Sequence, residues 1–108
     1  MTMKQKTKQV GTPESVNILG KTYAIEWLPH IYEDDGEQSG MSSTRHQVIK
    51  ISTSHHKEQQ KDTLLHEMLH AVDEEIGTKL EEEQVRHIAT CLFQVLNSNP
   101  NILEFLFT

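Results

Sequence analysis

The residues best suited to chemistry are His66, Glu67 and His70, which form a His-Glu-x-x-His pattern inside an apolar run. On an α-helix, residues four apart lie on one face one turn apart, so both imidazoles can bind one metal ion. We expect Zn²⁺, because it accepts imidazole nitrogen and in catalytic sites takes three protein ligands and a water. Glu67 would then act as the general base that deprotonates the attacking water.

A helix must carry this pattern for the two histidines to converge. Five apolar residues at helical spacing predict it: Leu65, Met68, Leu69, Val72 and Ile76. Thr53 or Ser54 is the expected N-cap, and Gly77 stands where a helix commonly ends in the left-handed conformation. His55 and His56 lie too far along the helix to join the site and are expected on the surface. The alternative is an ordinary amphipathic helix whose histidines bind no metal.

The third ligand is expected from a second helix, predicted over residues 80–96. Its apolar stripe comprises Val85, Ile88, Ala89, Leu92, Val95 and Leu96. Glu74 continues the series on the first helix, but the series spans roughly 12 Å, too far for bonds near 2 Å. By helical phase, Glu82 and Glu81 flank the stripe, whereas Glu83 faces solvent. We select Glu82, with Glu81 as the alternative, although all three glutamates would also complement the helix dipole.

Other polar residues have less defined roles. Asp73 either accepts a hydrogen bond from a ligand imidazole or is exposed to solvent. His87 is expected on the surface, away from the stripe. Four side chains have the chemistry to stabilise a developing negative charge, but the pattern selects none of them: Tyr23, Tyr32, Arg45 and His46.

Short strands are predicted before the first helix. Residues 16–19 and 22–28 form a hairpin around Gly20-Lys21, with Gly20 in the positive φ of a type II′ turn. Pro29 ends the second strand, and residues 30–40 form a solvated polar loop whose acidic residues lack Ca²⁺-loop spacing. Residues 47–52 form a strand that pairs with residues near 40–43. A sheet of about three or four strands followed by helices predicts the α+β class with a small antiparallel sheet.

An edge strand beside the metal-binding helix would offer unpaired backbone groups to an extended peptide. Under this hypothesis, Val48→Pro should weaken peptide binding without removing the metal. The apolar segment from Ile102 to Phe107 is expected to cover the core, or alternatively to form a homodimer contact.

Composition limits the classes of function. A chain of 108 residues with 35% hydrophobic residues predicts one domain over residues 15–108, after a flexible tail over residues 1–14. The net charge of −6 argues against nucleic acid or an anionic membrane as the main partner. Lys4, Lys6 and Lys8 precede no apolar segment of a secretory signal, and Cys91 has no partner for a disulfide, so we expect a cytoplasmic protein.

The segment Thr63-Leu64-Leu65-His66-Glu67-Met68-Leu69-His70-Ala71, placed between a strand region and a helix that opens with glutamates, resembles minimal zincin-type metallopeptidases. It is similar in particular to the gluzincin-like ImmA/IrrE and SprT-like groups and their small phage-encoded relatives. The resemblance covers residues 48–96. It implies a compact α+β domain that cleaves peptide or protein substrates, with Zn²⁺ bound by both histidines and a downstream glutamate and with Glu67 as base. The alternative is a non-catalytic zinc-binding structural or interaction domain.

Overall fold

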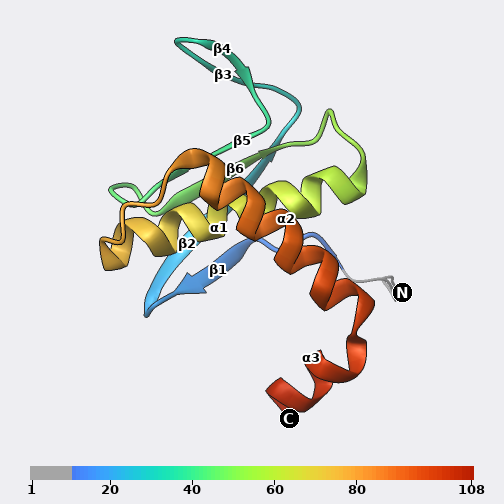
Figure 1. Ribbon diagram of the computed structural model, residues 1–108. Helices are drawn as coiled ribbons and strands as arrows, with labels where there is room; N and C mark the ends of the chain where they lie inside the picture. Colours follow the sequence, from blue (N-terminus) through green and yellow to red (C-terminus); the bar gives the residue numbers. More distant parts are fainter. Residues whose placement is uncertain (1–10) are drawn as a thin grey trace.

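Six strands precede three helices in residues 11–108, the part of the chain that this computed structural model describes (Figure 1). This order confirms the α+β class. The strands are β1 (Ser15–Ile18), β2 (Lys21–Leu28), β3 (Ile31–Glu33), β4 (Gly36–Gln38), β5 (Gly40–Ser43) and β6 (Val48–Ser52). The helices are α1 (Lys57–Ile76), α2 (Glu82–Ser98) and α3 (Pro100–Phe107). Residues 1–10 of the predicted tail lie outside the described residues.

The main sheet has the strand order β1-β2-β6-β5 and is mostly antiparallel. The sheet is thus the small, mainly antiparallel one expected, although its central pair, β2 and β6, is parallel. The path of the chain explains the parallel pair. After β2 the chain runs in the opposite direction as the edge strand β5. It then reverses again, so β6 lies between β5 and β2 and has the same direction as β2. The predicted pairing of residues 40–43 with residues 47–52 is confirmed, and it makes β5 an edge strand.

The predicted β1–β2 hairpin forms, but its turn lies one residue earlier than expected. Ile18 pairs with Lys21, so the two turn residues are Leu19 and Gly20, with φ of 52° and 90°. Positive φ at both positions is the type I′ geometry, not the predicted type II′. Asn17 supports the turn, since its Oδ1 accepts a hydrogen bond from the Gly20 N–H at 3.0 Å.

The prediction of a plain loop over residues 30–40 is wrong, because β3 and β4 form a second, two-stranded sheet there. Asp34 and Asp35 make its turn, followed by Gly36 at φ 117°. Ile31 is buried and anchors the hairpin to the body of the molecule. Strands of three residues are too short to show a clear alternating pattern in a polar sequence.

The core lies between one face of the main sheet and α1 (Figure 1). Its buried members are Ile18, Tyr23, Ile25, Ile49, Ile51 and Ala71, with Leu64, Met68 and Val72 packed against them. The predicted stripe of α1 is therefore partly wrong, because Ile76 is 60% exposed and Leu65 and Leu69 are half-buried outside this cluster. The helix instead buries Thr63 and Glu67. A prediction from the spacing of apolar residues could not identify these positions, because both residues are polar.

Helix α1 begins at Lys57 with His56 as N-cap, later than the predicted Thr53 or Ser54. Ser54 belongs to the turn after β6, where its hydroxyl lies 2.7 Å from the Ser52 hydroxyl. The predicted end is confirmed, since Gly77 has φ 76° and ψ 28° in the left-handed region. Helix α1 thus runs without interruption through the His-Glu-x-x-His pattern.

Helices α2 and α3 are less embedded than predicted. Val85 and Ala89 are the buried side chains of α2, whereas Ile88, Leu92 and Val95 of the predicted stripe are exposed. Helix α3 buries no side chain and extends away from the sheet, so the expectation that residues 102–107 cover the core is wrong (Figure 1). Within residues 11–108, no helix is long and apolar enough to cross a membrane.

Candidate metal centre

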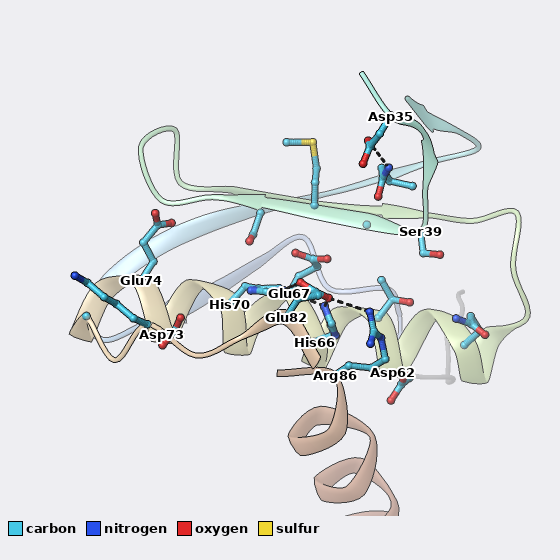
Figure 2. A pocket seen from close by; sticks show the side chains of 18 residues that line it. Asp35, Ser39, Asp62, His66, Glu67, His70, Asp73, Glu74, Glu82 and Arg86 are labelled. Atoms are coloured by element: carbon cyan, nitrogen blue, oxygen red, sulfur yellow. Dashed lines mark hydrogen bonds and ion pairs between the residues drawn. The ribbon is translucent and has the colours of Figure 1, made fainter. Parts of the chain in front are cut away.

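His66 and His70 lie on the same side of α1, with their Nε2 atoms 3.0 Å apart (Figure 2). Both side chains are half-buried. Burial lowers the pKa of the His66 imidazole, an effect that the neighbouring Glu82 carboxylate opposes. Burial therefore favours the neutral imidazole, which is the form that binds a metal ion.

Glu82 reaches both histidines from the first turn of α2. Its Oε2 lies 2.9 Å from the His66 Nε2, and its Oε1 lies 2.8 Å from the His70 Nε2. The neighbouring glutamates are placed differently. Glu81 is the N-cap residue of α2, where its backbone N–H donates to the Gln84 side chain at 2.8 Å, and Glu83 is exposed. Of the three candidates, Glu82 is therefore the one that the fold brings to the histidines.

The three side chains fit the needs of a zinc ion. One ligand atom from each lies within 4.8 Å of the others, the only such group of three His, Cys, Asp or Glu residues within residues 11–108. Tetrahedral Zn²⁺ with bonds of about 2.0–2.1 Å needs ligand atoms roughly 3.3 Å apart. The observed separations of 2.8–3.0 Å require only a small outward adjustment. Two nitrogens and one carboxylate oxygen are also the donor set that zinc prefers.

Asp73 organises the short connection between α1 and α2. Its carboxylate accepts hydrogen bonds from the Thr78 hydroxyl at 2.5 Å and from the Leu80 N–H at 3.1 Å. These bonds, led by the one from Thr78, lower the pKa of Asp73. Asp73 is therefore neither the partner of a ligand imidazole nor simply solvated, the two roles considered from the sequence. It holds the turn that delivers Glu82 to the histidines.

Glu67 faces β5 and is only 7% exposed. Burial raises the pKa of its carboxyl to about 7, although His70 and a hydrogen bond with the Ser42 side chain favour the ionised form. A carboxyl that titrates near neutral pH is suited to accept and return a proton. Glu67 is thus held beside the histidines without contributing to the convergent group of three.

A glycine allows β5 to approach Glu67 closely. A Cβ atom at Gly40 would lie 2.7 Å from the Thr63 Cγ2, 3.0 Å from the Lys50 carbonyl oxygen and 3.2 Å from the Glu67 Cγ. There is no room for that atom unless β5 moves away from α1. The close contact of strand and helix at the site therefore depends on glycine at this position.

We expect Gly40→Ala to lower the free energy of unfolding by about 1–3 kcal/mol, the usual cost of overpacking. Urea denaturation measures this change. Gly11→Ala is the matched control, because a Cβ atom there would have nothing within 4 Å. Equal stability of the two variants would contradict the close packing at Gly40.

An open groove of ≈ 1010 Å³ lies over the histidines (Figure 2). It is bounded by β5, α1 and the start of α2. Its lining includes Ser39, Gly40, Met41, Ser42, Thr63, His66, Glu67, His70, Glu82 and Arg86. The volume is at the upper end of the range for small-ligand sites, and the open shape suits a segment of extended chain.

The residues proposed from the sequence for charge stabilisation do not line this groove. Tyr23 is fully buried in the core, where its hydroxyl donates to Glu75 at 2.6 Å, and burial raises its pKa to about 12. Tyr32, Arg45 and His46 also lie outside the groove lining. Arg86 lines it instead, with Nη2 3.6 Å from the Glu82 Oε2. The sequence analysis did not select Arg86, although its position one helical turn after Glu82 could have placed it beside the site.

The remaining candidates are placed as surface residues. His55, His56 and His87 are exposed, as predicted. Glu74 is also exposed, and its Oε1 accepts a hydrogen bond from the Thr44 hydroxyl at 3.0 Å. None of these four residues belongs to the convergent group of His66, His70 and Glu82.

Comparison of the chain with protein-family models, curated proteins and solved structures finds no match.

Proposed function

We propose that this chain is a zinc-dependent metallopeptidase, with His66, His70 and Glu82 as zinc ligands and Glu67 as general base. The observation that carries the proposal is the pairing of a three-residue ligand group with a buried carboxylate in one open groove. A purely structural site has no need for that fourth group. The zincin-type pattern of the sequence supports the same assignment.

When bound, Zn²⁺ supplies Lewis-acid chemistry that polarises a peptide carbonyl and makes water a better nucleophile. Glu67 accepts a proton from the attacking water and returns it to the nitrogen of the leaving amine. Its raised pKa suits both transfers, because the carboxyl is neither a permanent base nor a permanent acid near neutral pH. Ser42 of β5 favours the ionised form of this carboxylate and so opposes part of the rise in its pKa.

The edge strand β5 is a candidate platform for an extended peptide, since it lines the groove and has one unpaired side. The test envisaged from the sequence, Val48→Pro, is unsuitable because Val48 belongs to β6, between β2 and β5. A substitution at Met41 in β5 addresses the same hypothesis at the edge itself.

A zinc-binding structural domain is the second candidate. It is favoured by the shallow packing of α2, in which Val85 and Ala89 are the buried side chains. A metal ion shared between α1 and the first turn of α2 would tie the two helices together, as structural zinc does in small domains. This function needs the three ligands but gives Glu67 no role.

We expect protein purified without added metal to contain about one zinc per 12.4 kDa chain by elemental analysis. A chelator should lower the melting temperature and added zinc should restore it. Free zinc at 100 times its Kd would add about 2.7 kcal/mol to the free energy of unfolding.

The zinc-loaded protein is then tested on a mixture of fluorogenic peptides. Cleavage that stops with the chelator supports the peptidase, whereas zinc binding without cleavage supports the structural domain. A chain that neither contains zinc nor takes it up would overturn both.

A further inference from the structure

The C-terminal end of the molecule presents an apolar surface that no described residue covers. We define this C-terminal apolar surface as Leu92, Val95, Ile102, Phe105, Leu106 and Phe107. Phe105 is 81% exposed and Phe107 is 78% exposed, which is exceptional for phenylalanine. The surface combines the second half of α2 with α3, which project together from the sheet (Figure 1).

We propose that the C-terminal apolar surface pairs two copies of this chain into a two-fold symmetric dimer. The charge distribution favours a second copy as the occupant. Residues 88–108 carry a single charged side chain, Glu104, in a chain with a net charge of −6. Two copies can therefore meet through these ends while their repelling carboxylates remain in solvent.

The same distribution argues against a membrane surface. Helices that lie on anionic membranes are rich in Lys and Arg on their polar face. No Lys or Arg follows Arg86 in this sequence. The segment has the apolar residues of such a helix without the charges that hold it to lipid.

The exposed area suits a dimer of ordinary size. A phenylalanine carries about 150–250 Å² of surface, so the two exposed rings present on the order of 300 Å² between them. Four further apolar side chains bring the surface to several hundred Å², close to the roughly 800 Å² that each partner contributes to a standard interface. An apolar patch of several hundred Å² on a protein surface often marks a site of interaction.

The surface is also separate from the candidate metal centre. None of its residues lines the groove over His66 and His70. Pairing through α2 and α3 therefore leaves the groove open. The two copies would place their apolar helices in one shared core, adding to the small core of each chain.

The test is the molar mass of the full chain by sedimentation equilibrium. We expect about twice 12.4 kDa at tens of micromolar protein. Phe105→Asp places two like charges in the shared core and should weaken association by roughly 30-fold or more, as loss of a central aromatic contact does. Tyr32→Asp is the matched control, because Tyr32 is an aromatic residue of the β3–β4 hairpin with 67% exposure.

A second measurement detects the contact between the two copies by spin labelling, with the C-terminal apolar surface of the wild type left unsubstituted. A spin label on Cys91, the single cysteine and an exposed residue of α2, should report one intermolecular distance in the wild type. That distance should vanish in Phe105→Asp with unchanged helical circular dichroism. A wild type that stays monomeric, a dimer that Phe105→Asp leaves intact, or a mass that grows without reaching a plateau would each overturn the proposal.

Discussion

Replacing Glu67 with glutamine is expected to lower kcat for peptide hydrolysis by about 10²–10⁴-fold while zinc stays bound. Glutamine has nearly the same shape, so it fits the space between α1 and β5 without disturbing Gly40. Its amide cannot take a proton from water at neutral pH. The loss should therefore fall on kcat, with zinc content unchanged by elemental analysis.

Glu74→Gln is the matched control, because Glu74 lines the same groove, is exposed and lies outside the ligand group. It removes the same charge without removing the base, so its kcat should stay within a few-fold of the wild type. Equal activity of Glu67→Gln and the wild type would exclude Glu67 as the base. Both candidate functions predict that Glu67→Gln keeps its zinc ion, so an active variant without zinc would contradict both.

Glu67→Gln should also change how the free energy of unfolding of the metal-free protein depends on pH. Burial raises the pKa of Glu67 from 4.5 to about 7 in the folded chain, so folding favours the protonated carboxyl. This contribution is complete below pH 4.5 and disappears as the pH rises through 7. The neutral glutamine avoids that loss, so metal-free Glu67→Gln should match the wild type near pH 4 and exceed its free energy of unfolding near pH 8.

Local sequence patterns were sufficient to predict that His66, His70 and Glu82 would converge. The spacing of His66 and His70 requires only that α1 be continuous, and the apolar run and Gly77 both indicated this. Glu82 followed from helical phase, because it lies one turn before Val85, which is buried. Such inferences succeed because the helix repeat is fixed by local backbone geometry.

Features that depend on distant contacts were not accessible in this way. The parallel pairing of β2 with β6 and the approach of β5 at Gly40 arise from how separate segments meet in space. Asp73 was likewise misjudged, because its partners Thr78 and Leu80 belong to the turn after the helix. Each of these positions the site, although none carries its chemistry.

The C-terminal segment illustrates a different limit. Its apolar residues were expected to cover the core, since burial is the usual fate of such a pattern. Pro100 begins α3 directly after α2, and the new helix extends away from the sheet. Periodicity indicates that a surface is apolar but not what covers it. The same reasoning explains why Ile88 and Val95 were placed in a core that they do not reach.

Glu82→Ala is expected to weaken zinc binding by more than about 100-fold, because even groups that only support a ligand cost 10–100-fold when removed. The variant leaves two imidazoles on one helix, which is too few for a stable zinc site. Competition with a chromogenic chelator measures the affinity. His70→Ala should show a loss of similar size, since it removes a ligand from the other helix.

Glu83→Ala is the matched control, as it removes the adjacent glutamate of the same helical turn, which is exposed. Its zinc affinity should stay close to that of the wild type. Glu81→Ala should also retain zinc, because Glu81 lies outside the convergent group and its backbone N–H can still donate to the Gln84 side chain in the variant. If Glu83→Ala or Glu81→Ala lost zinc and Glu82→Ala kept it, α2 would have to rotate to present another carboxylate. The distances of 2.8 and 2.9 Å from Glu82 to the two histidines argue against that arrangement.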